Sequence, residues 1–171
     1  MSLVIELSRM NVENGVNGPF GAAVFDESGT LVAPGVNMVL SEGCSLLHAE
    51  MVALALAQKA VGRFDLGQGG ERHFQLFTST EPCAMCLGAI PWSGISRLFC
   101  AARDEDARAI GFDEGTKPCD WKKAFSSRGI LVECDVLRSQ AVEVLKSYAR
   151  QGGKIYNSRP PAADKEINGK R

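Results

Sequence analysis

Two short segments, well separated along the chain, most constrain what this sequence can fold into. One contains His48, with Glu50 two positions further on, and the other contains Cys83 and Cys86 directly after Pro82. An imidazole and two thiolates suit a borderline-soft, tetrahedral ion such as Zn²⁺, and three protein ligands leave a fourth coordination position open for water. The fold is therefore expected to bring both segments together around one zinc ion.

Both metal segments are expected at the start of a helix. Residues 48–61 contain strong helix formers without internal Gly or Pro, and residues 83–90 form a second apolar run that a proline ends. A helix N-terminus carries a partial positive charge, which favours the thiolate of Cys83. Glu50 then points to a different side of the helix from His48, so it can move a proton of a nearby water without binding the metal.

Composition predicts an ordinary globular chain. Its 171 residues most simply form one domain, and a formal net charge of −1 offers no field that attracts nucleic acid or an anionic membrane. Glu6 interrupts the apolar run at the N-terminus, which predicts neither a secretory signal nor a membrane span. The expected compartment is the cytoplasm, where the six cysteines serve as metal ligands or free thiols.

Periodicity and turn residues predict alternating helices and strands. Helices are expected over residues 4–13, 48–61, 83–90, 104–109, 121–127 and 141–149, and strands over 20–25, 31–39 with a break at Pro34, 74–78, 96–102 and 130–136. This order predicts an α/β fold, a three-layer α/β/α sandwich with a five-stranded mixed sheet that has a hairpin first and parallel strands afterwards. Residues 1–157 are expected to form the zinc-dependent domain, and residues 158–171 a disordered tail.

Further motifs accompany the two metal segments. They are Pro19-Phe20-Gly21-Ala22, Gly35-Val36-Asn37, the run Glu-Pro-Cys-Ala-Met-Cys-Leu-Gly-Ala-Ile over residues 81–90, Trp92, and Gly111-Phe112-Asp113-Glu114. With the H-x-E and P-C-x-x-C signature of zinc deaminases, the sequence resembles the cytidine deaminase-like superfamily. Within that superfamily it resembles the purine-base branch typified by bacterial guanine deaminases. The resemblance extends over nearly all of residues 19–156.

The resemblance implies zinc-dependent hydrolytic deamination of a free nucleobase, guanine to xanthine and ammonia. Aminotriazines resemble the amidine edge of guanine, so side activity on them is expected. It implies proton shuttling by Glu50 and by an acid of the Phe112 loop, where the register matches Glu114 and leaves Asp113 as an alternative. Residues implied in substrate binding are Asn37, Ala49, Phe20, Trp92, Asp113 and Tyr156. The resemblance also implies a homodimer, in which the C-terminal segment carrying Tyr156 can cap the pocket of a neighbouring subunit.

Other interpretations stay open at this point. The metal site can be structural, closed by a fourth ligand such as Cys44, in a zinc-stabilised binding module without catalysis. A cytosine or nucleoside deaminase has the same zinc motifs, as does a tRNA adenosine deaminase, although RNA binding needs a basic face that a net charge of −1 does not favour. Glu50 can be a solvated helical acid, Phe20 and Trp92 core aromatics, and Asn37 a partner for backbone groups.

Overall fold

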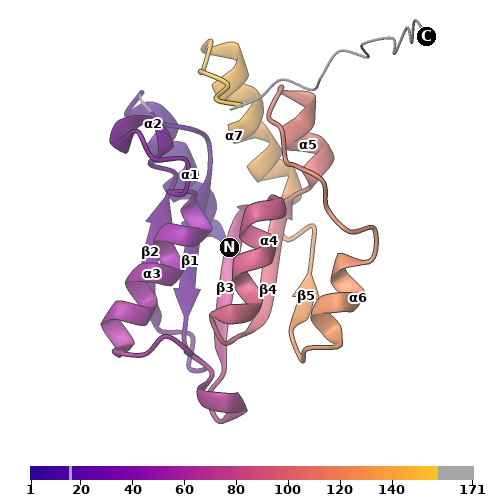
Figure 1. The fold of residues 1–171 in the computed structure, drawn as a ribbon. Coiled ribbons are helices and arrows are strands. Elements are labelled where there is room, and N and C mark those ends of the chain that lie inside the picture. Colours follow the sequence, from indigo (N-terminus) through magenta and orange to yellow (C-terminus); the bar gives the residue numbers. More distant parts are fainter. Residues whose placement is uncertain (16, 158–171) are drawn as a thin grey trace, which may run out of the picture.

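The computed structural model describes residues 1–15 and 17–157, and it contains one five-stranded sheet (Figure 1). Its strands are β1 (Gly21–Phe25), β2 (Leu31–Val36), β3 (Phe74–Thr80), β4 (Ile95–Ala102) and β5 (Leu131–Glu133), in the spatial order β2-β1-β3-β4-β5. β1 is antiparallel to both β2 and β3, whereas β4 is parallel to both β3 and β5. The predicted mixed sheet, with the hairpin first, is confirmed.

Helices cover both faces of this sheet (Figure 1). One layer contains α1 (Ser2–Glu13), α5 (Asp104–Ala109) and α7 (Arg138–Arg150), and the other contains α3 (Ala49–Val61), α4 (Ala84–Ala89) and α6 (Trp121–Ser126). Three shorter pieces complete the described elements: α2 (Val39–Glu42) and the 3₁₀ turns η1 (Gln68–Gly70) and η2 (Ile90–Trp92). The three-layer α/β/α sandwich is therefore confirmed.

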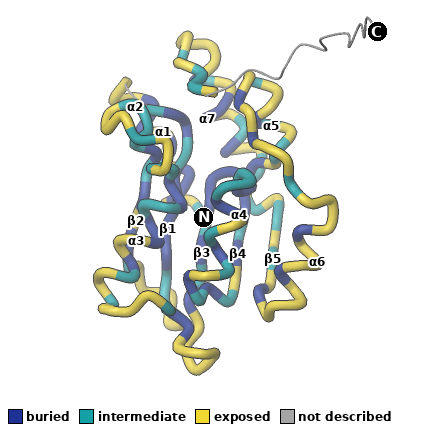
Figure 2. Tube along the Cα trace, in the orientation of Figure 1, coloured by how far each residue is buried: buried dark blue, intermediate teal, exposed yellow. Residues whose placement is uncertain are grey.

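Each face of the sheet has its own hydrophobic core. Leu54 of α3 packs with Leu76 and Leu98 of the central strands, while Ile5 of α1 packs with Leu145 of α7 in the core on the opposite face. Figure 2 shows the buried residues concentrated along the strands and the inner sides of the helices. Removing this apolar surface from water stabilises the fold by roughly 25 cal/mol per Å². Within the described residues, no helix combines the length and apolarity needed to cross a bilayer.

Several element boundaries differ from those expected. β2 continues through Pro34, because an edge strand tolerates a residue without a backbone N–H, and it ends at Val36, after which residues 39–42 turn into α2. β5 covers only residues 131–133, since the chain turns away at Asp135, whose φ is +66°. α7 begins at Arg138 instead of residue 141. The expected disordered tail, residues 158–171, lies outside the described residues.

A glycine of β2 determines how closely α3 approaches the sheet. A Cβ atom added to Gly35 would lie 2.3 Å from the backbone oxygen of Ala49 and 2.6 Å from the backbone nitrogen of Ala53. Real Cβ atoms do not approach backbone so closely, so only glycine fits between this strand and the helix. The contact holds the first turn of α3, which follows His48 and contains Glu50, against the sheet.

Candidate metal and active site

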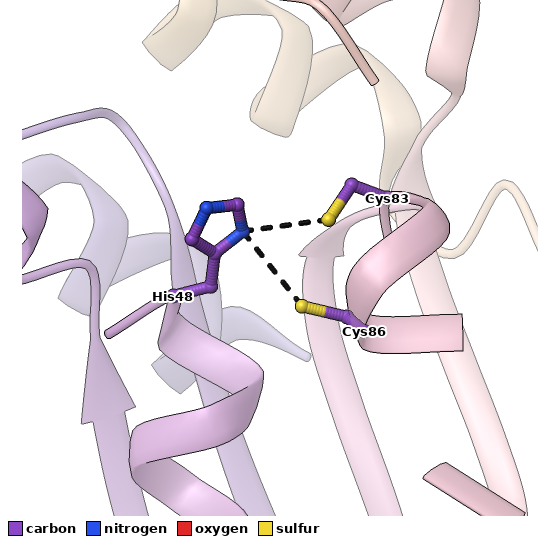
Figure 3. Close-up of side chains that lie close together, drawn as sticks. All are labelled: His48, Cys83 and Cys86. Carbon is purple, nitrogen blue, oxygen red and sulfur yellow. Dashed lines mark hydrogen bonds between the residues drawn. The ribbon is translucent and has the colours of Figure 1, made fainter. Parts of the chain in front are cut away.

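Two helix starts meet at the metal segments. His48 is the N-cap of α3 and Cys83 is the N-cap of α4, while Cys86 lies one turn into α4. His48 Nδ1 lies 3.4 Å from Cys83 Sγ and 3.7 Å from Cys86 Sγ (Figure 3). The three side chains, distant in sequence, converge on one point between the two helices.

Their spacing fits a zinc ion. A tetrahedral ion bound at 2.1 Å to nitrogen and 2.3 Å to sulfur would hold these atoms about 3.6 Å apart. The two observed nitrogen–sulfur distances lie on either side of that value. Cys44, proposed as the fourth ligand of a closed structural site, is not part of the potential metal-binding group that the described residues form. The geometry therefore supports a three-ligand zinc site.

Electrostatics prepare one thiol for metal binding. A hydrogen bond from Cys86, together with hydrogen bonding to His48, lowers the pKa of the Cys83 thiol to about 4. The hydrogen bond to Cys83 and burial raise the pKa of Cys86, which acts as the donor. Cys83 is thus a thiolate at neutral pH before any metal is bound.

Glu50 lies beside the metal triad with its carboxyl group out of bulk water. It is the second residue of α3, only 8 % exposed, and it lines the cavity next to the metal ligands. Burial and the negative charge of Cys83 raise the pKa of the Glu50 carboxyl. The interpretation of Glu50 as a solvated helical acid does not agree with this burial. A carboxyl group so placed can both accept and return a proton.

A cavity of about 390 Å³ opens over the metal triad. Of the residues predicted to bind substrate or to act in catalysis, those that line it are Phe20, Asn37, Glu50, Asp113, Glu114 and Tyr156, alongside the ligands His48 and Cys83. Ala49 is buried in the first turn of α3 and its side chain does not line the cavity. The fold therefore gathers nearly the whole predicted set at one place.

Trp92 does not line this cavity in the described chain. It ends η2, beyond the far end of α4 from Cys83, and it is 78 % exposed. This exposure contradicts the alternative interpretation of Trp92 as a core aromatic.

The acids of the Phe112 loop face different environments. Glu114 is 6 % exposed, and burial followed by the charge of Cys83 raises the pKa of its carboxyl group to about 8. The Asp113 carboxylate instead lies near the surface, 3.7 Å from Arg108, and accepts a hydrogen bond from the backbone N–H of Gly115. Glu114, the acid that the motif register favoured, is therefore the one whose burial at the cavity raises its pKa.

Several buried polar atoms of the cavity have no hydrogen-bond partner within the described chain. The Asn37 Oδ1 atom accepts a hydrogen bond from the backbone N–H of Val39, but its Nδ2 has none, nor have the hydroxyl groups of Thr80 and Tyr156. Leaving a buried polar group unpaired costs roughly 1–3 kcal/mol. All three residues line the cavity, so a polar ligand there can satisfy these atoms.

Three aromatic rings form an apolar wall of the cavity. Phe20 packs edge-on against Phe112 with ring centroids 4.9 Å apart, and Phe112 packs likewise against Tyr156 at 5.1 Å. Asn157 holds the segment that contains Tyr156 against the Phe112 loop. Its side chain donates a hydrogen bond to the Gly111 carbonyl and accepts one from the Asp113 backbone N–H. In the described residues, Tyr156 thus reaches the cavity of its own chain.

Sequence reasoning missed Lys117, which joins the Glu114 loop to the metal segment. Its side chain is only 9 % exposed, and its Nζ donates to the Pro82 carbonyl at 2.8 Å and pairs with Asp104. The Glu114 carbonyl accepts from the Ala84 backbone N–H at 2.9 Å. No local motif marks such a lysine, because its partners come from other segments.

The metal triad with its neighbouring buried acid agrees with comparison to known families. Residues 1–102 match the family described as the cytidine and deoxycytidylate deaminase zinc-binding region. The chain belongs to this family. Guanine deaminase from Bacillus subtilis is 38 % identical over 110 residues, which cover 64 % of this chain and 67 % of that protein.

Solved structures of higher identity share the fold. The guanine deaminase from Nitrosomonas europaea is 45 % identical, with a TM-score of 0.84 over 87 % of this chain and 82 % of that one. A solved complex with 2,6-diaminopurine is 46 % identical, with a TM-score of 0.85 over 93 % of this chain and 84 % of that one. These relatives support a zinc-dependent aminohydrolase on a cytidine deaminase-like fold.

Proposed function

We propose that this member of the zinc deaminase family hydrolyses guanine to xanthine and ammonia. The observation that carries the proposal is the convergence of two buried acids, Glu50 and Glu114, on the cavity that also receives His48 and Cys83. The similarity to guanine deaminases supports the choice of base. A binding module without catalysis would not need two carboxyl groups buried beside a three-ligand site.

Glu50 is the proposed proton shuttle of the reaction. A zinc ion at the triad supplies the Lewis acidity that makes water nucleophilic near neutral pH. Glu50, buried beside the triad, accepts a proton as the new carbon–oxygen bond forms and delivers it to the purine ring. The carboxyl group therefore needs to lie near the metal without binding it, which agrees with its absence from the ligand group.

Glu114 is the proposed acid for the leaving amine. With a pKa of about 8 it is largely protonated at neutral pH, so it can donate to the exocyclic nitrogen as the carbon–nitrogen bond breaks. Ammonia leaves with that proton, and the Glu114 carboxylate takes the proton of the new hydroxyl group as the carbonyl of xanthine forms. We place Asp113 outside this step, because its carboxylate pairs with Arg108 near the surface.

The shape and polarity of the cavity suit a flat, polar base. Phe20, Phe112 and Tyr156 offer aromatic surface for a ring, and the free Nδ2 of Asn37 offers a hydrogen-bond donor. A purine carries ring nitrogens and a carbonyl that accept such a bond. Aminotriazines share the amidine edge of guanine, so they are proposed as weaker substrates.

Substrate comparison tests the proposal directly. Zinc-loaded protein should change the ultraviolet spectrum of guanine and release ammonia at a kcat/KM well above that for guanosine, cytosine or cytidine. Preference for cytosine or for a nucleoside would instead favour that alternative, and inosine formation in tRNA would favour the tRNA deaminase. If no amine in this set released ammonia, the enzymatic proposal would fail.

Replacing Glu50 by glutamine separates catalysis from metal binding. We expect Glu50→Gln to keep bound zinc while kcat for guanine falls by at least about a hundredfold, since a positioned acid–base group contributes 10²–10⁴. Glu13→Gln, which changes an exposed acid of α1, is the matched control and should keep wild-type kcat. Metal content and ammonia release measure both effects. Retained turnover in Glu50→Gln would remove this residue from the mechanism.

Two further proposals concern the assembly and the compartment of the protein. The exposed Trp92 at the end of η2 supports a homodimer, because tryptophan is enriched at protein interfaces. Light scattering on the purified protein tests the dimer. A reducing cytoplasm suits a site whose ligands include free thiolates. Exchange of the C-terminal segment between subunits is not needed to bring Tyr156 to the cavity of its own chain.

A further inference from the structure

A second pair of cysteines lies between two strands, apart from the metal triad. Phe99 of β4 pairs with Glu133, the last residue of β5, in the parallel part of the sheet. Cys100, the next residue of β4, therefore lies next to Cys134, which directly follows β5. Adjacent strands are about 4.8 Å apart, within the Cα separation that a disulfide accepts. Both cysteines pack into the core on the α6 side of the sheet.

The two thiols are not equivalent. Cys100 is fully buried, whereas Cys134 is partly exposed at the end of β5. Interaction between the two thiols raises the pKa of Cys100 and lowers that of Cys134. A solvent-borne reagent therefore reaches Cys134 first, and Cys100 lies directly behind it.

A cation activates the outer thiol. The Nζ of Lys122, on α6, lies 3.5 Å from the buried carboxylate of Glu81. Interaction with the Cys100 thiol, followed by interaction with the Lys122 ammonium, lowers the pKa of Cys134 to about 7, against opposing effects of burial and of Glu81. A lowered pKa favours the thiolate of Cys134, which is the nucleophilic form.

We propose that Cys134 and Cys100 form a peroxide-reactive pair, with Cys134 as the attacking thiol and Cys100 as the resolving thiol. The Cys134 thiolate attacks one oxygen of a hydroperoxide, the O–O bond breaks, and Cys134 becomes a sulfenic acid while an alkoxide or hydroxide leaves. The Cys100 sulfur then attacks Cys134, the S–O bond breaks, and water leaves. Two thiols are oxidised to one disulfide as the hydroperoxide is reduced.

The location gives this pair a route to the active site. Ala102, two residues beyond Cys100 on β4, accepts a hydrogen bond from the backbone N–H of Glu81 at 2.8 Å. Glu81 stands two positions before Cys83 and pairs with the lysine that activates Cys134. Oxidation would therefore remove a thiolate charge near Lys122, whose partner Glu81 lies beside the metal segment.

Peptide mapping of the zinc-loaded full chain tests the proposal. After treatment with hydrogen peroxide near neutral pH, non-reducing digestion should recover peptides joined through Cys100 and Cys134. The intact mass should fall by two hydrogens and return to its original value with dithiothreitol. Zinc content should not change, because the metal ligands take no part. This readout does not depend on deaminase activity, so it stands or falls apart from the proposed function.

Variants separate the roles of the two thiols. Cys100→Ser should stop the reaction at a Cys134 sulfenic acid that dimedone traps, and Cys134→Ser should form no intramolecular disulfide. Cys119→Ser removes an exposed cysteine and is the matched control, which should form the disulfide at the wild-type rate. Oxidation of Cys119 before Cys134 would overturn the proposal. A disulfide between Cys83 and Cys86 with release of zinc, in place of the Cys100–Cys134 link, would also overturn it.

Discussion

Single side chains decide which acid of the Phe112 loop can take part in chemistry. Glu114 and Asp113 are adjacent and alike in charge, yet one is buried in the cavity and the other pairs with Arg108 at the surface. Burial raises the pKa of Glu114, and the neighbouring thiolate adds to that effect. The raised pKa of Glu114 is thus set by its environment, not by its residue type.

The two adjacent amide substitutions form a matched pair. Glu114→Gln should lower kcat for guanine about a hundredfold or more, because the amide cannot deliver a proton to the leaving amine. Asp113→Asn should change kcat by only a few-fold, since it removes an exposed ion pair. Steady-state kinetics with both variants measure the contrast. If kcat fell more in Asp113→Asn than in Glu114→Gln, the proton shuttle would be Asp113 and not Glu114.

At the scale of elements, the site depends on how α3 and the Glu114 loop are held. α3 packs on β2 through Gly35, and the loop is fastened to the residues before α4 by Lys117. Neither Gly35 nor Lys117 lines the cavity, but their contacts determine where Glu50 and Glu114 lie. Displacement of such groups by about 1 Å can cost a hundredfold in rate.

Glycine-to-alanine substitutions test the approach of α3. Gly35→Ala should destabilise the protein by about 1–3 kcal/mol, because the new methyl group meets backbone atoms of α3 that cannot move independently. Zinc affinity should fall with it, since the first turn of α3 follows His48. Gly88→Ala, at an exposed α4 position with open space, should instead be neutral or stabilise by about 0.5–1 kcal/mol. Denaturant unfolding and zinc titration distinguish them, and equal stabilities would contradict the close contact.

Removing the Lys117 ammonium tests the fastening of the loop. Lys117→Met should keep zinc and lower kcat by about tenfold to a hundredfold, because the loop loses its bond to the Pro82 carbonyl and Glu114 is no longer held in place. Lys123→Met, an exposed change on α6, is the control and should behave as wild type. If Lys117→Arg kept much of the wild-type kcat, this would support the role of Lys117 in positioning the Glu114 loop. Wild-type kcat in Lys117→Met would show that the loop holds its place without this lysine.

At the scale of the whole molecule, the metal joins parts that the chain keeps apart. His48 comes from the α3 side and the cysteines from α4, so a bound ion links segments that flank the middle of the sheet (Figure 3). A ligand that binds only the folded state stabilises it according to its concentration relative to Kd. Zinc is therefore expected to act on both activity and stability.

Removal of zinc by a chelator tests whether the ion supports both activity and stability. Removing zinc should abolish guanine turnover and lower the melting temperature, and zinc at a hundred times its Kd should restore about 2.7 kcal/mol of stability. Calorimetry of the chelated and reloaded protein gives the difference. Magnesium, which prefers oxygen ligands, should restore neither property. Identical melting curves with and without zinc would contradict a site built from these three ligands.

The sequence by itself determined the metal ligands, the order of elements and the deaminase family. It could do so because ligand type, helix starts and apolar periodicity are local properties of neighbouring residues. The tertiary structure decided the rest: it placed Trp92 at the surface, separated Glu114 from Asp113, and revealed Lys117 and the Cys100–Cys134 pair. Burial, hydrogen bonding and charge at those positions come from segments distant in sequence, so only the folded chain defines them.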